Sequence, residues 1–303
     1  SSDVCSSDLG VWVDDWGDIY IAESVGHTVR KVDGATGIIT TVAGTGALGS
    51  AGDGGQATSA QLNNPSGVSV DAAGNVYIAD KGNNSVRKVD AGAGTISTLI
   101  SGLSSPERVF VDGADLYIVE ATGLVKKNNT AGTAGATFAG GGASSGAAAN
   151  GLAPTGLLLT SPNGVAVDAS GNVYINDLDY VYKVDAGTNT VTILAGTTVG
   201  YSDGPATSAQ FDQAFGVSVD DAGNVYFGDN NNYVVRKIDA SGTVSTIAGD
   251  INLYQYSGDG GPAINAGFKN PRATFVDDAG NRSEEHTSEL QSPCNLVCRL
   301  LLE

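Results

Sequence analysis

The chain has 303 residues, and its 33 Asp and Glu against 15 Lys and Arg give a formal net charge of −18. An acidic chain whose basic residues stand singly or in pairs is unsuited to binding nucleic acid or an anionic membrane surface. No apolar run approaches the roughly 18 residues that a membrane-spanning helix needs, so we expect no direct insertion into a membrane.

The two ends of the chain differ from the Gly- and Val-rich sequence between them. Residues 2–9 (SDVCSSDL) and 282–289 (RSEEHTSE) can be encoded by opposite strands of one nucleotide sequence, and that sequence resembles a sequencing-library adapter. We therefore predict that residues 1–9 and 282–303 are non-native and that the domain spans residues 10–281. All three cysteines lie in the two ends, so they carry no argument for a disulfide or a metal site.

One motif recurs between these ends, and its first two copies read GVWVDDWGDIYIAE and GVSVDAAGNVYIAD. The copies with a complete motif lie at 10–23, 67–80, 108–120, 164–177 and 216–229. A sixth begins at residue 272 and breaks off at Asn281. The spacing fits a repeat of about 40 residues lengthened by insertions, which is the range of propeller blades.

Each repeat predicts four strands. In the second copy, GVSVD alternates apolar and small residues, and NVYIAD, SVRKVD (85–90) and TISTLIS (95–101) follow as further strands. Between the first two, the segment from Asp71 to Asn75 has the Asp and Gly that a tight turn requires. Four antiparallel strands per repeat predict an all-β propeller, and they fit less well a sandwich or a β-solenoid.

The stretch PSGVSVDAAGNVYIADKGNNSVRKVD, from Pro65 to Asp90, resembles the NHL repeat of bacterial type. The resemblance extends over essentially all of residues 10–281, although the third copy lacks the Gly-Asn of the first turn. Many NHL relatives have six blades. The resemblance therefore implies a propeller of four-stranded antiparallel blades, here five blades and the first strand of a sixth.

An acidic residue ends the second strand of each complete copy, and the turn that follows lies on the same face as the connections between blades. These candidate ligand-binding residues are Glu23, Asp80, Glu120, Asp177 and Asp229. Together they could form a ring that binds a polar ligand or a cation. Alternatively, each acid caps its own turn, and its recurrence in every repeat favours this second interpretation.

The insertions between blades lie at 43–64, 139–161, 195–213 and 248–270. Three of them contain a related motif, GDGGQATSAQL, SDGPATSAQF or GDGGPAINAGF, whose small and apolar tail predicts a plug beneath the loop. Asp53, Asp203 and Asp259 are weak calcium candidates, because one carboxylate per loop falls short of a dedicated calcium loop. We expect no other cofactor.

No catalytic residues can be assigned. His27 is the only histidine between the two ends, and it occupies a turn where other repeats have Asn83 or Asn231. A carboxylate site, built from Glu23 or Glu120 with Asn176, is the remaining catalytic arrangement. It corresponds to a metal-dependent propeller enzyme of gluconolactonase-like or lyase type.

Two further patterns recur within the predicted strands. The pairs at 30–31, 87–88 and 236–237 each read Arg-Lys, and we interpret them as solvated strand edges that offset neighbouring acids. Tyr77 and its counterparts occupy one fixed strand position, which predicts packing within or between blades.

The sequence as a whole predicts a non-catalytic binding or scaffold module that contacts a protein or carbohydrate through its long-loop face. The metal-dependent enzyme is the alternative. Acidity, low Lys content and a body without cysteine indicate a secreted or cell-surface protein of bacterial type.

Overall fold

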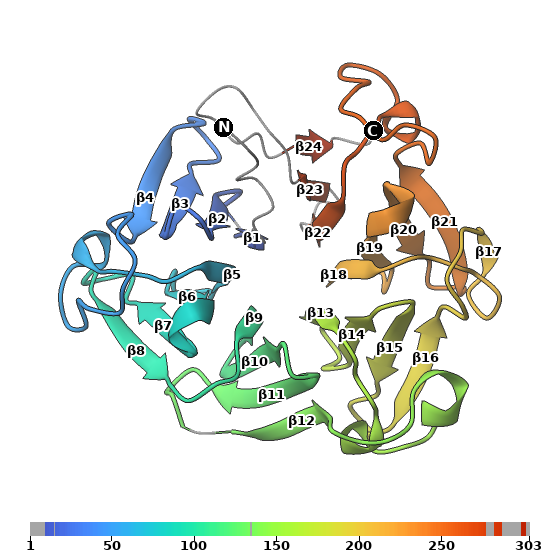
Figure 1. Ribbon diagram of the computed structural model, residues 1–303, viewed down its shortest axis with the longest axis horizontal. Coiled ribbons are helices and arrows are strands. Elements are labelled where there is room, and N and C mark those ends of the chain that lie inside the picture. Colours follow the sequence, from blue (N-terminus) through green and yellow to red (C-terminus); the bar gives the residue numbers. More distant parts are fainter. Residues whose placement is uncertain (1–9, 15, 134, 277–281, 287–297, 301–303) are drawn as a thin grey trace. The chain divides into compact units, whose positions relative to one another are not determined.

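The computed structural model describes residues 10–14, 16–133, 135–276, 282–286 and 298–300. These residues form β-strands, labelled in Figure 1, and short 3-10 helices. The chain divides into two compact units, residues 1–138 and 139–303. Each unit consists of sheets of three to five strands, and in every sheet four or fewer consecutive strands are neighbours, as the sequence predicts for blades.

The first unit holds three blades of four strands. Blade 1 contains β1 (Gly10–Val13), β2 (Ile19–Glu23), β3 (Thr28–Val32) and β4 (Ile39–Ala43). Blade 2 contains β5 (Pro65–Val70), β6 (Val76–Asp80), β7 (Ser85–Val89) and β8 (Ile96–Ile100). Blade 3 contains β9 (Pro106–Asp112), β10 (Asp115–Glu120), β11 (Leu124–Asn129) and β12 (Ala136–Gly140), whose last residues lie in the second unit. Within the unit, β5 lies beside both β1 and β9.

The second unit holds two further complete blades. Blade 4 contains β13 (Pro162–Val167), β14 (Val173–Asp177), β15 (Tyr180–Val184) and β16 (Val191–Ala195). Blade 5 contains β18 (Ala214–Val219), β19 (Val225–Asp229), β20 (Val234–Ile238) and β21 (Thr243–Ala248), and the short β17 (Gly204–Pro205) adds a fifth strand beyond β21. The all-β fold and the five complete blades predicted from the sequence are confirmed.

A sixth sheet begins with β22 (Pro271–Val276), the predicted first strand of the next blade. It pairs with β23 (Arg282–His286), which in turn pairs with β24 (Cys298–Leu300). Both added strands come from the segment that the sequence analysis sets aside as non-native. A segment can pair with a neighbouring strand whether or not its sequence is native. The non-native origin of residues 282–303 therefore stays a prediction.

The first turn of the blades is held by a repeated triad of Asp, Asn and Tyr. In blade 2, Asp71 Oδ1 accepts the backbone N–H groups of Ala73 and Asn75, while Oδ2 accepts Asn75 Nδ2 at 2.8 Å and the Tyr77 hydroxyl at 3.0 Å. Burial acts to raise the pKa of Asp71, but these hydrogen bonds outweigh it and lower the pKa. The same side-chain contacts recur at Asp168, Asn172 and Tyr174 and at Asp220, Asn224 and Tyr226.

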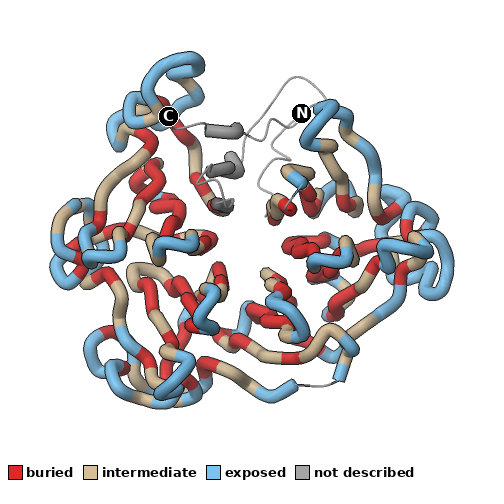
Figure 2. Tube along the Cα trace, turned by 180° about the vertical axis from the view of Figure 1, so that it is seen from behind, coloured by how far each residue is buried: buried red, intermediate tan, exposed pale blue. Residues whose placement is uncertain are grey.

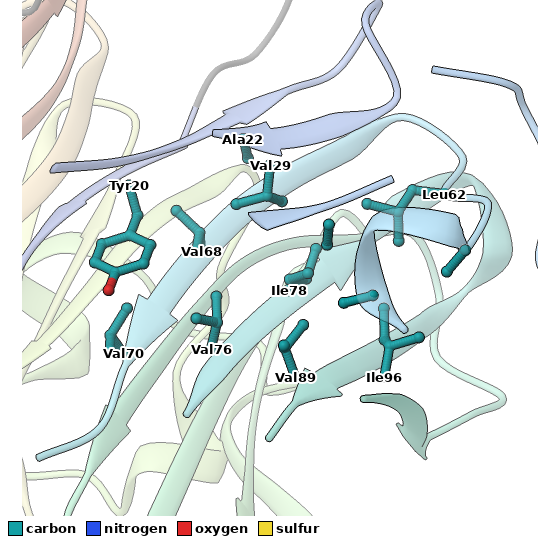
Figure 3. Packing of buried hydrophobic residues seen from close by; sticks show 13 residues of the cluster. Tyr20, Ala22, Val29, Leu62, Val68, Val70, Val76, Ile78, Val89 and Ile96 are labelled. Atoms are coloured by element: carbon teal, nitrogen blue, oxygen red, sulfur yellow. The ribbon is translucent and has the colours of Figure 1, made fainter. Parts of the chain in front are cut away.

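The strands are buried on both faces because each sheet packs against its neighbours, whereas the connections are exposed (Figure 2). Figure 3 shows this between blades 1 and 2, where Tyr20, Ala22 and Val29 face Val68 and Ile78. Ala57, Ala60 and Leu62, from the tail of insertion 43–64, complete the cluster and are at most 2% exposed. The predicted apolar plug beneath the loop is therefore present.

The insertions also form hydrogen bonds along the outermost strand of the next blade in the chain. Gly54 N–H donates to Ile96 O and Ile96 N–H donates to Gly55 O, which joins insertion 43–64 to β8. Gly151 and Leu152 exchange the same kind of bonds with Val191 of β16, and β17 pairs with β21. The predicted topology puts the insertions on the same face as the turns that follow the second strands. Their hydrogen bonds show that they cover the sheet edges as well, which blocks further strand pairing there.

Candidate functional site

The five acids that end the second strands are held mainly within their own blades. Four of them, Asp80, Glu120, Asp177 and Asp229, are at most 2% exposed, and only Glu23 reaches solvent to a larger extent. Such burial favours the capping interpretation over an open ring of ligands. The ligand-binding role of the five residues stays a prediction.

Blade 2 surrounds Asp80 with donors. Its carboxylate accepts the backbone N–H of Asn63 and the side-chain amide of Asn83, each at 2.7 Å, and it meets Arg87 Nη1 at 3.4 Å. Arg87 is 1% exposed, and its second terminal nitrogen, Nη2, donates to Asp53 Oδ1 at 2.6 Å. Asp53 belongs to insertion 43–64. One buried guanidinium thus joins the insertion to the end of β6 through two carboxylates.

Blade 5 repeats this arrangement almost atom for atom. Asp229 accepts the backbone N–H of Asp212, the side-chain amide of Asn232 and Arg236 Nη1, each at 2.8 Å. Arg236 Nη2 donates to Asp203 Oδ1 at 2.8 Å and to the carbonyl of Ser202 at 2.7 Å. Burial raises the pKa of Asp229 to about 6, although these donors act in the opposite direction.

The other blades vary the scheme. Glu23 accepts a hydrogen bond from Thr28 Oγ1 and meets Arg30 Nη1 at 3.8 Å, and the Arg30 side chain is 29% exposed. Glu120 accepts the backbone N–H of Ser104 and lies 3.4 Å from Lys126 Nζ. These two cations remain partly in solvent, unlike Arg87 and Arg236.

Blade 4 has no cation at this point. Asp177 accepts only backbone N–H groups, from Thr160 and Ser161, and burial raises its pKa. The position of Arg87 is taken by Tyr182, whose buried hydroxyl accepts the N–H of Gly146 at 2.9 Å. Burial raises the pKa of Tyr182 to about 12.

The three calcium candidates occupy equivalent places in their loops. Asp53 and Asp203 each contact a buried Arg, at 2.6 Å and 2.8 Å. Asp259 is exposed, and the blade that follows its loop continues outside the described residues. In the described part of the chain, no three His, Cys, Asp or Glu side chains gather in a way that could hold a metal ion. Calcium binding stays a prediction.

Two interpretations of single residues are corrected. Arg87 and Arg236 are at most 1% exposed, so the Arg of these Arg-Lys pairs is not a solvated edge residue. His27 has a left-handed φ of 51°, which fits the predicted turn role, and Nδ1 accepts the N–H of Asn64. The strand register aligns His27 with Asn84 and Tyr233, which have the same backbone conformation, and not with Asn83 and Asn231.

The lysines of the pairs and the recurrent tyrosines pack together. Tyr77 and Tyr226 are at most 1% exposed, which confirms their predicted packing role. Lys88 Nζ lies 5.3 Å from the centre of the Tyr77 ring, and Lys237 Nζ lies 5.7 Å from that of Tyr226. The strand therefore buries the Arg and places the Lys over an aromatic ring.

The exposed large hydrophobic side chains gather on the insertions. Among the described residues there are eleven, and only Trp16, Val25 and Ile38 lie elsewhere. The eight on insertions are Leu48, Leu158, Val199, Tyr201, Ile251, Tyr254, Tyr256 and Ile264. The insertions thus carry most of the exposed large hydrophobic side chains of the described residues.

Comparison with known proteins agrees with this architecture. Residues 48–109 match the family model of the teneurin NHL domain. A segment of 93 residues is 33% identical to Protein SUPPRESSOR OF QUENCHING 1, chloroplastic, of Arabidopsis thaliana, and it covers 31% of this chain and 9% of that protein.

Among solved structures, a structural genomics protein of unknown function from Bacteroides thetaiotaomicron has a TM-score of 0.67 at 21% identity, over 94% of this chain and 69% of that one. An auxiliary nutrient binding protein from Bacteroides ovatus has a TM-score of 0.66 at 16% identity, over 92% and 66%. A nidogen/laminin complex gives 0.58 at 15% identity, over 78% of each chain. A streptogramin B lyase gives 0.55 at 12% identity, over 91% and 75%.

Likenesses at these identities show the fold, which is a β-propeller. The repeated motif and the match over residues 48–109 define the type of repeat. The chain is an NHL-repeat β-propeller. No helix in the described part of the chain is long and apolar enough to cross a membrane.

Proposed function

We propose that this propeller is a non-catalytic binding module whose partner, a protein or a carbohydrate, docks on the insertions. The gathering of exposed apolar side chains on these segments carries the proposal. Interfaces are enriched in aromatic side chains, and three of the eight exposed residues are tyrosines. The named binding functions of the nutrient-binding and nidogen/laminin neighbours support the same class of function.

Insertion 248–270 carries four of the eight exposed large hydrophobic side chains on the insertions, so we propose it as the main docking surface. Tyr254 is 54% exposed and Tyr256 is 42% exposed. The ring of Tyr254 packs on Tyr233 with 4.6 Å between centroids, and Lys269 Nζ lies 5.5 Å and 5.6 Å from the centres of the Tyr254 and Tyr256 rings. Rings held in place by such contacts lose little conformational freedom on binding, which suits them as anchors for a partner.

The partner is best sought outside the cell, because the net charge of −18 and the low Lys content suit a secreted or surface-attached module. Two defined probes separate the partner classes. An immobilised panel of bacterial and plant polysaccharides tests a carbohydrate partner. Crosslinking to intact cells of the source organism, followed by mass spectrometry and binding of the purified candidate, tests a protein partner.

The proposal is tested with a Tyr254→Ala, Tyr256→Ala double variant, which we expect to bind the identified partner at least about tenfold more weakly. Ile38→Asn is the matched control, because Ile38 is 61% exposed and lies outside the insertions. Full binding by a chain that lacks residues 248–270 contradicts the proposal. A stoichiometric divalent metal in the purified chain, lost with activity on chelation, supports the metal-dependent enzyme instead.

A further inference from the structure

A cavity of about 490 Å³ lies in the first unit where β1, β5 and β9 end. Its wall includes two tryptophans, Trp12 and Trp16, and three carboxylates, Asp14, Asp71 and Asp112. The volume is in the range of small-molecule sites. Among the described residues, none from the insertions lines this cavity.

The three carboxylates differ in what they bind. Asp71 is fully engaged in the triad with Asn75 and Tyr77. Asp14 is 9% exposed, and Oδ1 accepts the N–H groups of Trp16 at 3.1 Å and Asp18 at 2.9 Å. No hydrogen bond reaches Asp14 Oδ2 from the described residues.

The sequence explains why Asp14 Oδ2 accepts no hydrogen bond from the described residues. Where blades 2, 4 and 5 have the Asn of the triad, blade 1 has Asp18, which cannot donate to a carboxylate and instead pairs with Lys31. Asp112 stands in the third blade's shortened turn, beside Gly113, and no described residue donates a hydrogen bond to it. Burial raises the pKa of both Asp14 and Asp112, and it outweighs the opposing effects of Lys31 on Asp14 and of Lys127 on Asp112.

The aromatic wall adds a second kind of surface. Trp16 is 65% exposed, and it is the most exposed of the large hydrophobic side chains in the described part of the chain. Trp12 is held edge-to-face against Phe110, with ring centroids 5.3 Å apart. An indole face attracts cations through its quadrupole, more strongly than the ring of Tyr or Phe.

No Lys or Arg lines this cavity among the described residues. A second cavity shares Asp14 and Trp16 and contains Lys31, but its ammonium is paired with Asp18. We propose that the cavity at the ends of β1, β5 and β9 binds a small organic cation, an ammonium group with apolar substituents. The substituents lie against the indole rings and the charge faces Asp14 and Asp112.

A bare metal ion is less suited to the same wall, because the indole rings offer it no oxygen ligand and Asp71 already has its partners. A neutral sugar would use the rings and could donate its hydroxyls to the carboxylates, but it would leave their negative charge without a counter-charge. The inference is independent of the docking of a partner on the insertions, since it concerns different residues.

The chain contains only two tryptophans, both in the wall, so tryptophan fluorescence reports on this cavity and on the neighbouring one that shares Trp16. We would titrate the whole chain with choline and, separately, with its uncharged isostere in which carbon replaces the ammonium nitrogen. Choline should change the emission and bind with heat measurable by calorimetry, and the neutral isostere should bind at least about tenfold more weakly.

Two variants locate the site. Trp16→Ala removes an exposed ring and should weaken choline binding about tenfold, with Trp12 left as the reporter, and Asp14→Asn should weaken it by a similar factor. Asp221→Asn removes one exposed charge from a turn of the second unit and should leave binding unchanged. Equal affinity for choline and the neutral isostere, unaltered binding by Asp14→Asn, or no response up to ~10 mM choline overturns the proposal.

Discussion

Blades 2 and 4 place different side chains at one strand position, and the insertion before each blade accounts for the difference. Arg87 and Tyr182 stand at the same register position, opposite Ile78 and Ile175. The insertion before blade 2 supplies Asp53 to the buried guanidinium, whereas the insertion before blade 4 supplies the N–H of Gly146 to the buried hydroxyl. Strand and loop residues therefore form matched pairs.

Blades 3 and 5 agree with this rule. Blade 5 follows an insertion that contains Asp203, and its Arg236 is fully buried. Blade 3 follows a connection of five residues, 101–105, and its Lys126 side chain is 27% exposed. A cation is buried at this position where the preceding loop brings a carboxylate to it, because an unpaired buried charge is costly.

The largest effect is expected from removing a buried guanidinium. Arg236→Met leaves the buried Asp229 and the loop residue Asp203 without their shared cation, which should lower the free energy of unfolding by about 3–5 kcal/mol. Arg30→Met, at the same register position but 29% exposed, should cost less than about 1 kcal/mol. Urea denaturation of both variants measures the contrast, and equal losses would contradict the matched-pair rule.

A smaller effect should appear as pH dependence. Because the pKa of Asp229 is raised to about 6 in the folded chain, its contribution to stability is full below its unfolded pKa near 3.8 and is lost as pH rises through about 6. Relative to Asp229→Asn, the native chain should therefore gain stability on acidification from pH ~7 to pH ~4, by on the order of 3 kcal/mol.

Asp220, in the same blade, should behave in the opposite sense, and so provides the control. Its pKa is lowered, since hydrogen bonds from Asn224 and Tyr226 outweigh the effect of burial. Its contribution is present above the unfolded pKa and is lost as pH falls through the folded one. Stability differences against Asp220→Asn should thus shrink on acidification. Parallel pH profiles for the two variants would show that burial does not set the titration of Asp229.

Tyr182→Phe tests the blade without a cation. The change removes the acceptor of the Gly146 N–H and should cost about 1–3 kcal/mol, less than the loss of Arg236. Tyr201→Phe removes only an exposed hydroxyl contact with Thr246 and should cost less than about 0.5 kcal/mol. Thermal unfolding of the two variants would separate the cases, and an unchanged Tyr182→Phe variant would mean that the loop is held by other contacts.

The smallest effect concerns the lysines over aromatic rings. Lys237→Met removes the ammonium that lies 5.7 Å from the Tyr226 ring centre and keeps most of the apolar stem. The loss should be at most about 1 kcal/mol. The free energy of unfolding is measured by urea denaturation. A larger loss would mean that Lys237 also stabilises the ion pairs of Arg236 with Asp229 and Asp203.

The fold could be predicted from the sequence because its local signals agree with one another. The turn from Asp71 to Asn75 fixes the first hairpin, and the alternation in GVSVD and NVYIAD fixes the strands on either side. The buried Arg residues were missed because an Arg-Lys pair in a strand usually faces solvent. In a blade both faces of the sheet are covered, so alternate residues offer no solvated side.

The signals for the missed features are present in the sequence but depend on comparing its repeats. Arg87 and Arg236 occur in the blades that follow a loop with Asp53 or Asp203, and Tyr182 occurs where that Asp is absent. The cavity is marked by the loss of the triad's Asn at Asp18, next to the two tryptophans. Which oxygen of Asp14 remains free depends on side-chain geometry, and a motif does not contain that information.

The coverage of β8, β16 and β21 by the insertion before their blade also sets an order for assembly during synthesis. Gly54 and Gly55 precede their partner Ile96 by an entire blade, and Gly151 precedes Val191 in the same way. Chains emerge from the ribosome with their N-terminal residues first. The hydrogen bonds of such an insertion therefore cannot form until the last strand of the next blade has emerged. A chain that lacked this strand would leave the backbone groups of the preceding insertion without these partners.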